Sequence, residues 1–368
     1  MTRFLRAVLA ISILMCGAAL ASAQSPARHS TAMGFTPWPV DFNEAGLDRT
    51  YAFIRAHSNL VAHHFDGGVP WDAAARSVAF PTHLQRDWVR RKANTPADAQ
   101  VLVAVTPLNF GRDGLAPAWT DRGDNQRLPR AWRNKRLNDP EVVAAYTNYV
   151  QRVIAYFEPD YLAIGIEANI VISKAPALWN DYAALHAEVY ARIKQAHPGL
   201  PVFATVQYEH LRGIEAEAQK YLKYQLPAVA TLMRSSDLLA LSTYRYGTVH
   251  PNPMGPGYFD VAKSFGKPIA IAESGAMSKS NRIYGMTLPA SEADQARFVS
   301  GLLDHAARNR FAFVVNWVAI DFEPGLKRLP RSVREIAKAW VNTGLQTSDG
   351  RAKPALGIWQ GYLAQSRP

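Results

Sequence analysis

The sequence predicts an α/β fold, a single (β/α)8 TIM barrel, from two observations. After residue 31, short apolar runs alternate with amphipathic stretches of helical spacing along the rest of the 368-residue chain. Eight such runs occur, which is the number of strands in a barrel of alternating strands and helices. The expected strands span residues 32–36, 59–64, 101–106, 161–167, 201–207, 238–243, 268–273 and 311–317.

The runs have the character of buried parallel strands, because they are short, almost continuously apolar and bounded by turn residues. The run at 268–273, for example, begins at Pro268 and is followed by Gly275. The clearest helix is expected at 140–157, with Asp139 as its cap and Pro140 at the first position. Stretches with similar spacing, which we also expect to be helical, cover residues 182–196, 291–309 and 332–341.

The first 23 residues have the features of a secretory signal peptide. Arg3 and Arg6 precede an apolar stretch at 7–20, and the small residues 21–23 fit a cleavage site before Gln24. We therefore expect an exported protein, periplasmic or secreted. A lipoprotein is a less favoured alternative, because Met precedes the only cysteine directly and fits a lipobox poorly.

The remaining chain is expected to be one domain. Residues 24–31 are small and polar, which predicts a disordered leader, and no linker, low-complexity tract or repeat divides residues 32–368. The long segment 107–138 is expected to cover the active face. No second apolar run is long enough to span a membrane. Cys16 would leave with the signal peptide, so the mature chain could form neither a disulfide nor a cysteine-ligated metal site.

Composition and motifs exclude several function classes. The net charge is +11, but the basic residues are scattered, which favours a solvated basic face, or attraction to an acidic polymer or an anionic cell surface, over nucleic-acid binding. No Gly-x-Gly-x-x-Gly, Walker or Gly-x-Ser-x-Gly motif occurs, so we expect no cofactor and no esterase elbow. A monomer is expected.

Two of the expected strands end on a glutamate, Glu167 on the fourth and Glu273 on the seventh. A carboxylate at the end of a buried strand needs a partner or a chemical role, because its desolvation is costly. The fourth and seventh strands face each other across a barrel mouth, where functional residues lie. The two glutamates could therefore be the carboxyl pair of a glycosidase. The alternative is that each pairs with a nearby Arg or Lys.

Further strand-end side chains suit a carbohydrate, whose hydroxyl groups need hydrogen bonds and whose C–H faces stack on aromatic rings. Of the adjacent His63 and His64, only one can face the barrel interior. A hydroxyl from Tyr244 could hold an ionised Glu273. Trp71 and Trp119 are either sugar platforms or local packing. The expected substrate-binding residues are Trp38, His64, Asn169, Gln207, Tyr208, Tyr244, Tyr246, Asn316 and Trp317.

A metal-dependent hydrolase on the same fold is another alternative. His63, His64, Asp66, Glu209 and Asp321 could supply ligands, but neither His-x-His nor His-Glu-x-x-His spacing occurs. We therefore predict that the protein has no metal site.

Glutamates after strands four and seven, Tyr244 after strand six and Trp317 after strand eight resemble the pattern of the clan A retaining glycoside hydrolases. The overall sequence pattern of the chain looks nearest to family 53, the endo-β-1,4-galactanases. This resemblance implies that Glu167 is the acid/base, Glu273 the nucleophile, Tyr244 its hydrogen-bond partner and Trp317 the platform under the sugar. It also implies a β-linked polysaccharide or oligosaccharide as substrate.

One position departs from the clan pattern. Ile166 stands where the clan usually has an Asn that binds the sugar 2-hydroxyl before the acid/base. An aliphatic side chain cannot make this contact, which normally strengthens in the transition state. Either another residue supplies it, or the substrate differs, or activity is weakened or lost. A carbohydrate-binding barrel without activity is therefore the second hypothesis.

Overall fold

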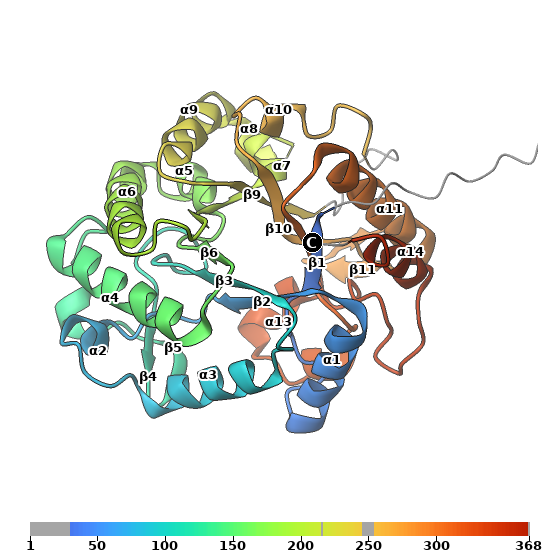
Figure 1. Cartoon of the computed structure of the whole chain (residues 1–368), viewed down its shortest axis with the longest axis horizontal. Coiled ribbons are helices and arrows are strands. Elements are labelled where there is room, and N and C mark those ends of the chain that lie inside the picture. Colours follow the sequence, from blue (N-terminus) through green and yellow to red (C-terminus); the bar gives the residue numbers. More distant parts are fainter. Residues whose placement is uncertain (1–29, 215, 245–253, 367–368) are drawn as a thin grey trace, which may run out of the picture.

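Parallel strands form a nearly closed barrel in the computed structural model, which describes residues 30–214, 216–244 and 254–366, and helices surround the barrel (Figure 1). Around the sheet the strand order is β7-β6-β3-β2-β1-β13-β10-β9-β8. The strands are β1 (Ala32–Phe35), β2 (Leu60–Phe65), β3 (Gln100–Val105), β6 (Tyr161–Ala163), β7 (Val202–Phe203), β8 (Thr205–Gln207), β9 (Leu239–Tyr244), β10 (Ile269–Gly275) and β13 (Phe313–Asn316).

The predicted eight-unit barrel is confirmed, with its fifth strand divided in two. β7 pairs with β6, and β8 pairs with β9, so the two edges of the sheet are consecutive pieces of chain separated by Ala204. The expected fifth strand, residues 201–207, therefore supplies both edges of the sheet, which meet at Ala204.

Helices follow most of the strands. The predicted helix at 140–157 is confirmed as α4, although the Asp139 side chain does not cap it and accepts instead from the Arg136 backbone N–H. α13 ends at Ala337, four residues before the expected end. The helices are α1 (Glu44–His57), α2 (Trp71–Ala75), α3 (Thr82–Asn94), α4 (Pro140–Phe157), α5 (Val171–Lys174), α6 (Trp179–Ala196), α7 (Tyr208–Leu211), α8 (Ala216–Gln219), α9 (Leu222–Met233), α10 (Asp260–Lys263), α11 (Glu292–Asn309), α12 (Glu323–Leu326), α13 (Arg331–Ala337) and α14 (Pro354–Leu363).

The fourth strand is shorter than the sequence predicts. β6 ends at Ala163, and the chain then bends so that Glu167 takes a left-handed conformation with φ of 48°. At Gly165 an added Cβ would lie 2.1 Å from the hydroxyl of Tyr182, so the bend passes very close to α6. The apolar run continues through this bend because the residues remain buried there, which is why the run alone overestimates the strand.

The apolar core has an inner and an outer layer. Alternate strand residues fill the barrel interior, among them Leu60, Phe203 and Phe313, and Ile166 belongs to this inner group. A larger layer lies between the strands and the helices. The inner side chains form a solid floor, so the polar strand-end residues above it are confined to one mouth of the barrel.

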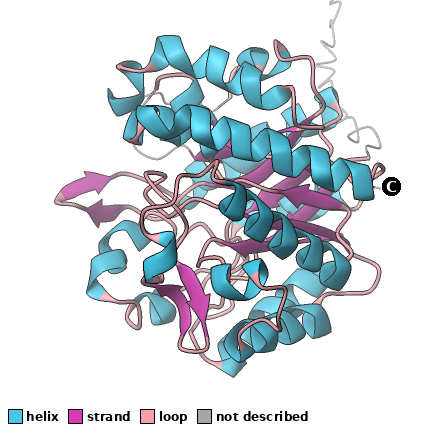
Figure 2. Ribbon diagram, turned by 90° about the vertical axis from the view of Figure 1, so that its left-hand side faces the viewer, coloured by secondary structure: helices cyan, strands magenta, loops and turns pink. Residues whose placement is uncertain are grey.

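Two small antiparallel sheets lie outside the barrel (Figure 2). β4 (Ala118–Thr120) and β5 (Gly123–Gln126) belong to the long segment 107–138, and β11 (Asn281–Ile283) pairs with β12 (Met286–Leu288) after β10.

The proposed signal peptide and most of the leader lie outside the described residues. Thr31, the last residue of the expected leader, is buried, so the folded domain already includes it. In the part of the chain that the structure describes, no helix is both long and apolar enough to cross a membrane.

Candidate active site

The two strand-end glutamates lie at irregular points of the barrel. Glu167 sits in the bend after β6, where its backbone N–H donates to the Thr205 hydroxyl at 2.7 Å. Glu273 is on β10, where the pairing with β9 shifts register between Ile271 and Glu273. Both carboxylates are largely buried, with 19% and 14% of their side chains exposed.

The carboxylates of Glu167 and Glu273 influence each other. Burial raises the pKa of Glu273 to about 8, and the negative charge of Glu167 adds to this effect. The Tyr244 hydroxyl donates a hydrogen bond to Glu273 Oε1, which favours the ionised form and acts in the opposite direction. The structure thus brings together Glu167, Glu273 and Tyr244 from the fourth, seventh and sixth barrel strands.

His64 borders Glu273, while His63 points away from the barrel interior. His64 Nδ1 lies 3.7 Å from Glu273 Oε2, and its ring packs edge-on against Trp317 with centroids 5.4 Å apart. Burial lowers the pKa of His64 to about 4, so the imidazole is neutral at pH 7 and the contact is not a charged pair. His63 is fully buried and its Nε2 lies 2.9 Å from the Thr95 hydroxyl.

Arg112 is a site residue that sequence reasoning missed. Its guanidinium forms a two-point contact with Asp66, at 3.3 and 3.2 Å, and its Nη2 lies 4.0 Å from Glu167 Oε2. Burial opposes the charge, but the carboxylates of Asp66, Glu167 and Glu273 outweigh this effect and raise the pKa of Arg112. The sequence signal for Arg112 is Asp66, a carboxylate after the second strand, because a carboxylate in that position needs a partner.

The aromatic side chains divide into two groups. Trp38 and Trp317 pack together at 5.3 Å beside His64, and Trp340, which sequence reasoning did not single out, packs edge-on against Tyr244 at 6.3 Å. Trp71 and Trp119 are buried instead. Their indole N–H groups donate to Ala116 O and His83 Nδ1, so they stabilise the segment 107–138 and the chain beside it.

Several expected substrate-binding residues have hydrogen-bond partners within the chain. Asn169 is fully buried, donating to Gln207 O and to Gln225 Oε1, both at 3.0 Å. The Tyr208 hydroxyl donates to Tyr258 O at 2.6 Å. These contacts hold neighbouring segments together, and they turn Asn169 and Tyr208 toward the protein interior. β6 ends at Ala163, so Asn169 does not continue the fourth strand to the mouth of the barrel.

Gln207 and Asn316 also have structural contacts, and Tyr246 lies outside the described residues. Gln207 caps α7 by accepting from the His210 backbone N–H. Asn316 donates to Val318 O at 2.8 Å and to Thr343 O at 3.1 Å, which fixes the turn that carries Trp317.

Glu209 fixes the position of Tyr244 through hydrogen bonds to the end of β9. Its buried carboxylate accepts from the hydroxyls of Thr243 and Tyr258, from the Tyr244 backbone N–H and from Gln207 Nε2. Burial raises the pKa of Glu209. Among the residues that the structure describes, no three His, Cys, Asp or Glu side chains are grouped so as to hold a metal ion.

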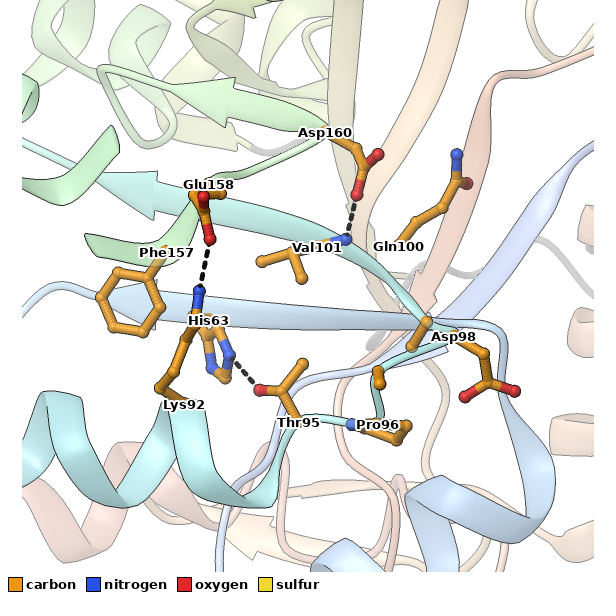
Figure 3. Close-up of a pocket in the computed structure, with 12 residues that line it drawn as sticks. His63, Lys92, Thr95, Pro96, Asp98, Gln100, Val101, Phe157, Glu158 and Asp160 are labelled. Atoms are coloured by element: carbon orange, nitrogen blue, oxygen red, sulfur yellow. Dashed lines mark hydrogen bonds and ion pairs between the residues drawn. The ribbon is translucent and has the colours of Figure 1, made fainter. Parts of the chain in front are cut away.

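A separate hollow of about 420 Å³ lies at the other end of the barrel (Figure 3). Its lining includes Gln100 and Val101 at the start of β3 and Asp160 just before β6, so it opens at the amino ends of the strands. Lys92 pairs with Glu158 at 3.0 Å, and Asp160 accepts from the Val101 backbone N–H. These charged groups already have partners, and the hollow is remote from the glutamate pair.

Solved structures of glycoside hydrolases with a (β/α)8 barrel match the chain in fold. An exo-β-1,4-mannosidase from Opitutaceae bacterium strain TAV5 has a TM-score of 0.64 at 14% identity; the match covers 93% of this chain and 61% of the mannosidase. This chain thus spans less than two thirds of that protein's length.

Two further structures show the same fold. A GH5_18 protein from Streptomyces cattleya, solved as a single-residue variant in complex with Manb1-4GlcNAc, has a TM-score of 0.60 at 17% identity over 91% of this chain and 79% of that one. A GH53 catalytic domain from Ignisphaera aggregans has a TM-score of 0.55 at 16% identity over 90% and 96%. No protein-family model and no curated protein sequence matches the chain. The expected resemblance to clan A barrels, with family 53 among them, is thus confirmed in the fold.

Proposed function

We propose that this protein is an exported, retaining glycoside hydrolase that cleaves a β-linked polysaccharide or oligosaccharide. The observation that carries the proposal is the contact of Tyr244 with Glu273, together with the coupling of Glu273 to Glu167. The β-linkage is inferred from the mannosidase and from the Manb1-4GlcNAc ligand of the Streptomyces structure. Export is proposed from the first 23 residues of the sequence.

In the proposed reaction, Glu167 protonates the glycosidic oxygen while Glu273 attacks the anomeric carbon. The bond to the leaving group breaks, and a covalent glycosyl–Glu273 ester forms. Glu167 has then lost its proton and takes one from water, which hydrolyses the ester and restores both carboxyl groups. Tyr244 stabilises the ionised Glu273 before attack, and Arg112 stabilises Glu167 when it is ionised and acts as the base.

The missing Asn at position 166 needs a substitute in this proposal. Ile166 is only 2% exposed and packs in the barrel interior, so its side chain cannot reach a sugar hydroxyl. His64 is the neutral polar side chain beside Glu273, and 15% of its side chain is exposed. We assign the hydroxyl contact to His64.

The test is a polysaccharide screen with reducing-end detection, using wild type, Glu167→Gln and Glu273→Gln. Both substitutions keep side-chain size but remove ionisation, so we expect each to lower turnover by roughly 10²–10⁴-fold. Glu188→Gln on α6, an exposed residue paired with Arg192, is the matched control and should retain full activity. Full activity of both active-site variants would refute the assignment. NMR of the first anomer released tests retention of configuration.

Ile166 favours a second candidate, a carbohydrate-binding barrel without catalysis, because the transition-state contact of the clan is absent at this position. Such a protein would be retained on a polysaccharide affinity gel yet release no reducing ends. Wild-type turnover on any polysaccharide in the screen, lost in Glu273→Gln, excludes this candidate.

A further inference from the structure

The turn that follows β3 is a tightly bonded unit, here called the 108–115 loop. Leu108 and Leu115 form an antiparallel bridge, and the Asn109 backbone N–H donates to Gly114 O at 3.0 Å. The Asn109 side chain donates to Asp113 Oδ1 at 2.6 Å and accepts from the Asp113 backbone N–H at 3.1 Å. Because these hydrogen bonds all lie within the loop, they define its shape.

Arg112 fixes this loop beside the proposed acid/base. Its guanidinium donates to Asn109 O at 2.8 Å within the loop and to the Asp66 carboxylate after β2. The same group lies 4.0 Å from Glu167 Oε2. The side chain is only 4% exposed, so the anchor is part of the interior. The loop therefore borders the Glu167 end of the carboxyl pair.

Other elements border the Glu273 end. His64 lies 3.7 Å from Glu273, Tyr244 donates to it, and Trp317 packs on His64. The walls on the two sides of the pair thus come from different parts of the chain. Because a general acid protonates the leaving-group oxygen and a nucleophile attacks the sugar carbon, these walls face different sugar residues.

The 108–115 loop presents one large aromatic ring to solvent. Phe110 is 64% exposed, and its ring centre lies 6.0 Å from Arg112 Cζ, the same guanidinium that approaches Glu167. An exposed phenyl ring on a well-ordered loop contributes little to the core. Its flat apolar face is suited to stacking on the C–H face of a pyranose ring.

We propose that the 108–115 loop forms the leaving-group side of the cleft, with Phe110 as the platform for the sugar residue whose glycosidic oxygen Glu167 protonates. The inference rests on the proposed function and deepens it, because it names the loop and the side chain that bind the leaving-group sugar.

The experiment compares Phe110→Ala with wild type on two substrates that share one glycone, an oligosaccharide with a sugar leaving group and an aryl glycoside. Loss of the platform should lower kcat/KM on the oligosaccharide about tenfold and change it less than twofold on the aryl glycoside. Phe110→Trp should restore the oligosaccharide rate. Tyr224→Ala, which removes a 51% exposed aromatic ring on α9, is the matched control and should change neither rate.

Equal loss on both substrates, or no loss on the oligosaccharide, would overturn the platform while leaving the glycosidase proposal intact. If wild type cleaves no glycoside, the proposed function fails and the platform is judged by calorimetric titration of the same oligosaccharide. Phe110→Ala should then weaken binding about tenfold relative to Tyr224→Ala, and equal affinities would overturn it.

Discussion

Glu273 occupies an environment with opposing demands on its charge. Burial and the nearby Glu167 favour the protonated carboxyl, and the Tyr244 hydroxyl favours the carboxylate. The proposed nucleophile must be ionised and the proposed acid protonated, so the pair has to share one proton in the right arrangement. The cation of Arg112 near Glu167 enters the same balance. Single side-chain contacts therefore decide the protonation of the site.

The raised pKa of Glu273 predicts a pH-dependent cost to stability. Between the ordinary Glu value of 4.5 and about 8, the folded protein holds a proton that the unfolded chain releases, so stability falls as pH rises through this window. Glu273→Gln cannot ionise and should lose this dependence. We expect it to gain on the order of 1–3 kcal/mol over wild type at pH 8 relative to pH 5, measured by urea unfolding. Glu188→Gln should follow wild type, and an unchanged slope in Glu273→Gln would contradict the pKa shift.

At the scale of elements, the close approach of β1 to β2 depends on a glycine. A Cβ added at Gly34 would lie 2.0 Å from the Leu60 carbonyl oxygen, a backbone atom that cannot move aside without shifting β2. These strands pair at Gly34 and Leu60, and β2 carries His64 to the site. The spacing of the first two strands thus bears directly on the position of a proposed sugar-binding residue.

We therefore expect Gly34→Ala to destabilise the fold by about 1–3 kcal/mol, measured by urea unfolding. Gly199→Ala is the matched control, because an added Cβ there meets no atom within 4 Å. Its unfolding midpoint should equal that of wild type or exceed it slightly. Equal stability of the two variants would show that β1 and β2 can separate at no cost.

At the scale of the whole molecule, the segment after β13 joins the end of the barrel to its beginning. Trp359 on α14 packs against Phe35 of β1 at 4.8 Å and donates to His57 O at 2.8 Å, while α14 also lies along α11 (Figure 1). Lys353, just before α14, forms a buried pair with Asp321 at 2.7 Å. Burial raises the pKa of Asp321 to about 7 and lowers that of Lys353, so each charge depends on the other.

Replacing only one partner of the Lys353–Asp321 pair should destabilise the fold more than replacing both. Lys353→Met leaves the Asp321 carboxylate buried without its cation, and we expect a loss of about 3–5 kcal/mol in the free energy of unfolding. The double variant Lys353→Met with Asp321→Leu should recover most of this loss, because no buried charge remains. A double variant as unstable as the single one would show that packing, rather than the lone charge, is responsible.

The strands and α4 could be predicted because their signals are local. A short apolar run between turn residues, or a helical apolar face after Pro140, already reflects how the segment will be buried. The same signal failed at β6, where burial continues after the strand ends, and Asn169, an expected substrate-binding residue, is fully buried instead. A local apolar pattern thus predicts which residues are buried more reliably than it predicts where a strand ends.

The number of strand–helix units could be predicted from the sequence alone, and so could a glutamate on the seventh strand and another shortly after the fourth, because these are properties of contiguous residues. The contacts of Arg112 with Asp66 and Glu167, and the packing of Trp340 against Tyr244, could be seen only in the folded molecule. These contacts join segments far apart in the chain, and they form only when the closed barrel brings its strand ends to one mouth. The charge of the site is set by those distances, which no local pattern encodes.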